Sequence, residues 1–112
     1  MYTHARQTPE VLELRREAGV WLKELREKRG ISQREMAEMV GVLYYTYISQ
    51  IETGRGKVPI DSYDSWAKAL GLPTRIFVKQ IMRYYDPVTY GHLFGDDIGD
   101  SATSLISLIE AR

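Results

Sequence analysis

The sequence predicts a small all-α protein of about five helices, with a helical extension at its C-terminal end. Apolar residues recur at helical spacing, capping residues and glycines bound the segments that carry them, and no stretch shows the alternation typical of strands. The 112 residues have the length of one domain, and a hydrophobic fraction of 44% allows a modest core.

The first helix is expected to begin at Thr8-Pro9-Glu10, where a hydroxyl cap precedes a proline and an acidic residue. Gly19 is expected either to bend this helix or to divide it in two. The basic residues and the glycine of Lys28-Arg29-Gly30 mark its end. Its apolar stripe consists of Val11, Leu14, Ala18, Trp21, Leu22 and Leu25.

A helix-turn-helix is predicted over about residues 31–54. Ser32 and Glu35 form a capping box that opens a short helix. Gly41 provides the turn, and a second short helix covers roughly 44–52. The residues expected to face inward are Met36, Ala37, Val40, Ile48 and Ile51.

Three further helical segments are expected after this motif. The first covers 59–70 and stops at Gly71, and the second covers 74–84. Asp86-Pro87 breaks the second, and a short helix or turn follows over 88–94. Their inward residues are expected to be Tyr63, Trp66, Ala67, Leu70, Ile76, Phe77, Ile81, Met82, Tyr90, Leu93 and Phe94.

The chain is therefore divided into a helix-turn-helix domain over 1–85 and a C-terminal extension over 86–112. An acidic, glycine-rich loop over 95–99 precedes apolar residues with the spacing of a coiled-coil seam. The seam is expected to join two copies of the chain, and the alternative is that it folds back on its own core. Its residues are Ile98, Ala102, Leu105 and Ile109.

Few residues could carry catalysis or hold a metal. The chain lacks cysteine, which excludes disulfides, thiol catalysis and cysteine metal sites. His4 and His92 are isolated, so neither a metal nor another cofactor is expected. No catalytic constellation occurs, so an enzyme is not expected. Without a membrane-spanning apolar run or a secretory signal, we expect a cytoplasmic protein.

Basic residues gather around the predicted motif although the whole chain has zero net charge. Residues 15–57 hold nine basic and six acidic residues, a net of +3. The first fourteen residues have a net of −1, and residues 58–112 a net of −2. A basic stretch around an exposed helix is what a DNA-facing surface requires.

Several short motifs follow one another in a fixed order over residues 22–71. They are Leu22-Lys23-Glu24-Leu25-Arg26, Ile31-Ser32-Gln33-Arg34-Glu35-Met36-Ala37, Gly41-Val42, Tyr47-Ile48-Ser49-Gln50-Ile51-Glu52-Thr53-Gly54, Pro59 and Trp66-Ala67-Lys68-Ala69-Leu70-Gly71. Together they make this segment similar to the lambda-repressor-like, Cro-type helix-turn-helix family, also called the xenobiotic-response-element (XRE) family. The chain departs from the family pattern by one additional residue between Gly41 and Glu52, and Tyr44 or Tyr45 replaces the usual small polar cap.

The resemblance implies a fold of four or five helices and the residues that contact DNA. Contacts to bases are implied for Tyr45, Thr46, Ser49 and Gln50, and contacts to phosphates for Gln33, Tyr47, Arg55 and Lys57. These residue types suit the task, because glutamine can pair with adenine and serine or threonine can contact any base edge.

Several of these residues also have a structural alternative. The tyrosines can bury their rings in the core, Gln33 can support the capping box, and Gln50 and the loop residues can simply be solvated. Glu52 is expected to make a backbone or arginine contact. The basic residues of the first helix are expected to form a mostly solvated face.

The sequence thus predicts a bacterial transcriptional regulator that binds double-stranded DNA at a palindromic operator as a homodimer. One alternative is an antitoxin that binds DNA and covers a toxin with its C-terminal apolar stripe. Another is a protein-interaction module that has lost DNA binding. A ligand-sensing domain is not expected, because the roughly 40 residues after the motif are too few for one.

Overall fold

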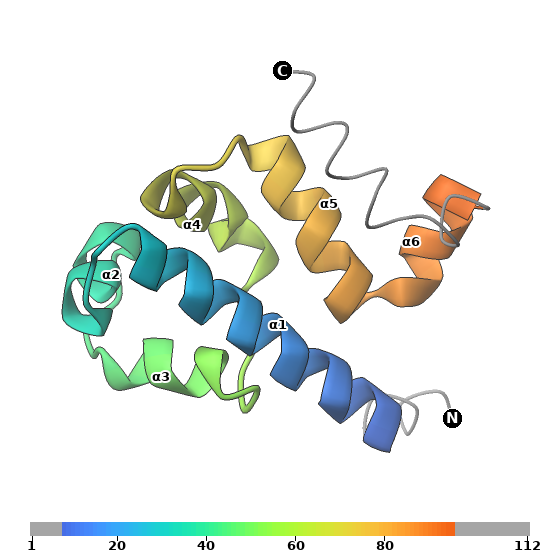
Figure 1. Ribbon diagram of the computed structural model, residues 1–112, viewed down its shortest axis with the longest axis horizontal. Coiled ribbons are helices and arrows are strands. Elements are labelled where there is room, and N and C mark those ends of the chain that lie inside the picture. Colours follow the sequence, from blue (N-terminus) through green and yellow to red (C-terminus); the bar gives the residue numbers. More distant parts are fainter. Residues whose placement is uncertain (1–7, 96–112) are drawn as a thin grey trace.

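The computed structural model describes residues 8–95, and all regular structure within that range is helical. The expected all-α fold is thereby confirmed. The seam residues Ile98, Ala102, Leu105 and Ile109 lie outside the described range. Figure 1 shows the six α-helices of that range, which are α1 (Pro9–Lys28), α2 (Gln33–Val40), α3 (Thr46–Glu52), α4 (Tyr63–Leu70), α5 (Thr74–Tyr85) and α6 (Pro87–Phe94).

Helix α1 is the longest of these and packs against both α3 and α5 (Figure 1). The Thr8 hydroxyl accepts a hydrogen bond from the Val11 N–H at 3.2 Å, and Gly30 follows the helix with a φ of 73°. Both predicted ends are confirmed. The predicted division of the helix at Gly19 is wrong, because α1 continues through this residue over all 20 positions.

The core lies where the five helices α1 to α5 meet. Trp66 and Phe77 are its largest fully buried side chains, and Leu22 of α1 is completely buried beside them. The Trp21 ring stacks on Phe77 with centroids 5.7 Å apart. Fully burying one large apolar side chain stabilises a fold by roughly 1.5–3 kcal/mol, so these residues fix how the helices pack.

Some expected boundaries shift in the structure. The segment expected to be one helix over 59–70 begins with a 3-10 turn, η2 (Ile60–Ser62), because Pro59 is extended, and α4 starts only at Tyr63. Helix α3 begins at Thr46 instead of residue 44. Leu93 was expected to face inward but is 61% exposed, since α6 buries only Tyr90.

Candidate nucleic-acid interface

The helix-turn-helix begins at the predicted capping box. The Ser32 N–H donates to the Glu35 carboxylate at 2.7 Å, and the Glu35 N–H donates to the Ser32 hydroxyl at 3.0 Å. Gly41 ends α2 in the left-handed conformation, with a φ of 78°. Only glycine adopts this conformation at little cost, so the sequence itself fixes the sharp turn towards α3.

Helix α3 is anchored by its apolar side and leaves its polar side accessible. Ile48 and Ile51 are buried, whereas Thr46 and Gln50 are exposed and Ser49 is half-buried. The predicted base-contacting residues of this helix therefore lie outside the core. A short helix with this division is suited to the major groove of DNA, which admits one α-helix.

A buried network links the carboxyl end of α3 to α1 and α2. Arg26 donates from Nε to Oε2 of Glu52 at 2.7 Å and from Nη2 to Oε1 at 3.1 Å. Its Nη1 donates to the Ile31 carbonyl at 2.9 Å. The Gln33 side chain adds a hydrogen bond from Nε2 to Oε1 of Glu52 at 3.0 Å. These bonds fix the position of α3 relative to the other two helices.

This network confirms one expectation and corrects another. Glu52 makes the predicted arginine contact, but its partner Arg26 was expected on a solvated face and is only 7% exposed. Hydrogen bonding to Glu52 raises the pKa of Arg26 above its ordinary value, while desolvation by burial opposes that rise. A guanidinium can be buried here because the carboxylate and a carbonyl satisfy its donors.

Gln33 occupies the first position of α2, beside the amino end of that helix. Its amide nitrogen carries two hydrogens, and one of them goes to Glu52. The side chain is thus held in place without using its full hydrogen-bonding capacity. This arrangement is compatible with a phosphate contact from the second hydrogen.

The three tyrosines around the start of α3 differ in their surroundings. Tyr47 packs against the core, and burial raises its pKa, with a further rise from the negative charge of Asp61. Tyr44 is 68% exposed. Tyr45 occupies the N-cap position without a side-chain cap, and the Arg34 guanidinium lies over its ring at 4.3 Å from the centroid.

The loop after α3 lies close to α1. Gly54 has a φ of 85°, and a Cβ added to it would lie 2.9 Å from the Arg16 Cα, so only glycine fits. The Arg55 N–H donates to the Gln50 carbonyl at 2.9 Å, and the side chain of Arg55 is exposed. The two basic residues of this loop, Arg55 and Lys57, therefore follow the carboxyl end of α3.

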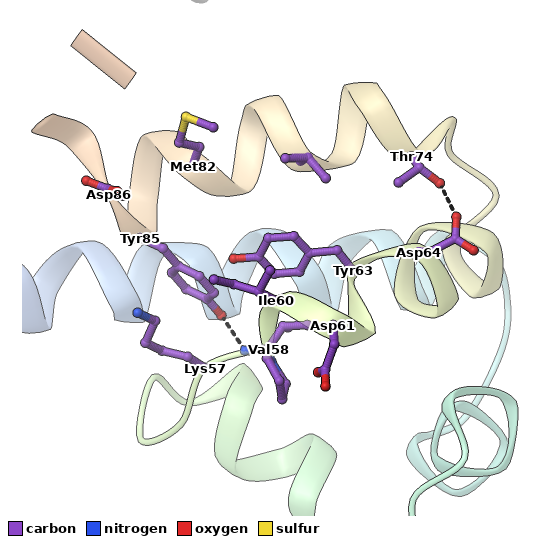
Figure 2. A pocket seen from close by; sticks show the side chains of 12 residues that line it. Lys57, Val58, Ile60, Asp61, Tyr63, Asp64, Thr74, Met82, Tyr85 and Asp86 are labelled. Atoms are coloured by element: carbon purple, nitrogen blue, oxygen red, sulfur yellow. Dashed lines mark hydrogen bonds between the residues drawn. The ribbon is translucent and has the colours of Figure 1, made fainter. Parts of the chain in front are cut away.

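Lys57 lies at one end of a groove of about 850 Å³ that the loop forms with η2, α4 and α5 (Figure 2). Its ammonium is 5.1 Å from the centroid of the Tyr85 ring, whose hydroxyl accepts a hydrogen bond from the Val58 N–H at 3.1 Å. Partial burial lowers the pKa of Lys57, and the nearby charge of Arg15 lowers it further.

Sequence reasoning did not find Tyr85 or Arg34 as neighbours of the expected contact residues. Tyr85 is 28 positions from Lys57 in the sequence, and Arg34 is 11 positions from Tyr45. The spacing of residues within one helix cannot predict a contact between side chains that lie on different segments. Of the expected residues, the structure brings Gln33 to the end of α3 and leaves Arg55 and Lys57 on the loop that follows.

Within residues 8–95, no group of three or more His, Asp or Glu side chains could hold a metal ion. In the same range, none of the helices has the length and apolar character needed to cross a membrane.

Two short helices, a tight glycine turn and an accessible second helix define a helix-turn-helix protein. A family model described as helix-turn-helix matches residues 22–77, which are 56 of the 112 residues. The chain belongs to this family, the lambda-repressor-like or XRE class, and is a DNA-binding regulator of that class. A search of curated proteins found no match to this chain.

Proposed function

We propose that the protein is a sequence-specific transcriptional regulator that inserts α3 into the major groove as part of a homodimer. The observation that carries this proposal is that α3 has one buried side and one exposed side. Ile48 and Ile51 anchor the apolar side in the core, whereas Thr46 and Gln50 are exposed. The Arg26–Glu52 ion pair holds the carboxyl end of the helix. Such rigid support is what a base-contacting helix needs.

In this proposal, Tyr45, Thr46, Ser49 and Gln50 face the base edges. Gln33, Tyr47, Arg55 and Lys57 contact the phosphates on either side. As a regulator in bacteria, the protein would act in the cytoplasm, where the DNA is.

We infer a homodimer because one recognition helix is short. A single helix-turn-helix contacts few base pairs, and each mismatch costs only about 1–3 kcal/mol. Two copies double the contacts and make the half-site spacing part of the recognition. The seam Ile98, Ala102, Leu105 and Ile109 is the proposed contact between the copies.

Selection from random double-stranded DNA with the purified full-length protein tests the central proposal. We expect an enriched palindrome, and an affinity that falls steeply as salt rises, since each phosphate contact releases counterions. If no sequence is enriched even at low salt, the proposal is wrong. Salt-insensitive binding to a protein partner would instead favour an interaction module.

Sedimentation of the full-length chain tests the dimer separately. Leu105→Asp places a charge in the proposed seam and is expected to yield monomers. Val20→Asp is the matched control, because Val20 is 51% exposed on α1 and its replacement should leave the dimer intact. An unchanged dimer for Leu105→Asp would contradict the role of the seam.

A further inference from the structure

Helix α3 contains no lysine or arginine among its seven residues, Thr46-Tyr47-Ile48-Ser49-Gln50-Ile51-Glu52. Arginine or lysine paired with the O6 and N7 atoms of guanine is the commonest specific contact in the major groove. The helix itself therefore lacks the usual partner for a guanine. Such a residue would have to come from a neighbouring element.

Arg34 of α2 is the cation that the structure holds at the start of α3. Its guanidinium carbon lies 4.3 Å from the centroid of the Tyr45 ring, the residue directly before α3. Both side chains are exposed and border a shallow hollow of about 290 Å³. The exposed side chains of Leu43 and Tyr44 lie at the same hollow.

We propose that Arg34 recognises a guanine next to the amino end of α3, with Tyr45 as its positioning residue. This inference rests on the proposed function. A guanidinium over an aromatic face keeps the N–H donors at its rim available for a bidentate contact. The stacking also limits the rotamers of a flexible side chain before DNA binds, which reduces the entropy lost on binding.

Two features favour a base over a phosphate as the partner of Arg34. The residues at the amino end of a recognition helix are the ones that meet base edges, and Tyr45 holds Arg34 at this end. Glu38 borders the same hollow. Its negative charge would repel a phosphate, whereas a carboxylate can accept a hydrogen bond from the amino group of the cytosine paired with guanine.

The test uses the full-length protein and the sequence that it selects from random DNA. Binding is measured for sites carrying each base at each position. We expect Arg34→Ala to lose the preference for guanine at one position of each half-site, by about 5-fold to about 100-fold. Preferences at the other positions should not change. Tyr45→Leu should weaken the same preference, because it removes the aromatic surface while keeping an apolar side chain.

A modified base makes the test specific to the proposed atoms. Replacing that guanine by 7-deazaguanine removes the N7 acceptor, which should weaken wild-type binding and leave Arg34→Ala binding unchanged. Arg75→Ala is the matched control, because Arg75 is an exposed residue of α5, which lies on the other side of α1 from α3 (Figure 1). This control should keep the wild-type base preferences.

Two results would overturn the assignment. An equal loss of affinity for all sequences in Arg34→Ala would make the residue a phosphate contact, and an unchanged profile would remove it from the interface. In both cases the wild-type selection still stands, so the proposed function survives. If the wild-type protein itself selects no sequence, the proposed function and this assignment both fail.

Discussion

Arg26, close to the end of α1, binds Glu52, the last residue of α3, through two hydrogen bonds of 2.7 and 3.1 Å. The side chains of the two residues are only 9% and 2% exposed. The pair therefore operates away from the screening of bulk water. It fixes the carboxyl end of α3 against α1, the longest helix in the described part of the chain.

Removing one partner of this pair should be strongly destabilising. Arg26→Met leaves the Glu52 carboxylate buried without its cation, and breaking a buried pair in this way costs about 3–5 kcal/mol. Urea denaturation measures the loss in free energy of unfolding. Glu13→Gln is the control, because the Glu13–Arg16 pair is exposed, at 56% and 59%, and should contribute under about 1 kcal/mol. Equal losses for the two variants would contradict this role.

Gly19 should not tolerate a methyl group. A Cβ added there would lie 2.2 Å from the Glu52 carbonyl oxygen, a backbone atom that cannot rotate away. Although alanine favours helices, we expect Gly19→Ala to lower the thermal midpoint, because overpacking costs about 1–3 kcal/mol. Gly56→Ala meets only the Ile51 side chain at 3.6 Å and is the control. A more stable Gly19→Ala protein would refute the close approach of α1 and α3.

Stability should depend on pH through Asp86, which caps α6. Hydrogen bonds from Thr89, including its N–H at 3.1 Å, hold the pKa of Asp86 below its ordinary value. A carboxylate with a lowered pKa stabilises the fold above its ordinary pKa of about 4, and this contribution disappears as the pH falls through the lowered value.

Denaturation of wild type and Asp86→Ala at several pH values tests this capping role. The variant should be about 1 kcal/mol less stable near neutral pH, and the difference should shrink below about pH 4. Asp86→Asn keeps a capping oxygen without a titrating charge, so it should retain most of the stability. A difference that grows in acid would have the wrong sign for this cap.

The proposed DNA contacts should separate into two kinds of effect. Gln50→Ala is expected to relax the preference at one base position, because its exposed amide can pair with adenine. Lys57→Ala is expected to weaken binding to all sequences alike and to reduce the slope of log affinity against log salt by about 1. Competition binding over a salt series checks both. A sequence-dependent effect of Lys57→Ala would reverse its assignment.

Local signals made much of the fold predictable. The capping box of Ser32 and Glu35 and the glycine stop at Gly41 act over three or four residues, so the sequence displays them directly. The start of α3 was less predictable. Tyr45 takes the N-cap position without a capping hydrogen bond, and without that local signal the helix boundary shifted by two residues.

What the sequence by itself determined is the helix-turn-helix between residues 31 and 54, because periodicity, caps and glycine turns are properties of neighbouring residues. Only the tertiary structure decided the roles of Arg26 and Gly19. From the sequence alone, Arg26 was expected to be a solvated cation and Gly19 to interrupt its helix. Arg26 can be buried because the Glu52 carboxylate lies beside it. Gly19 is required because the backbone of Glu52 passes too close to it for a side chain to fit. Both depend on the packing of α1 against α3, a contact between segments that no local pattern encodes.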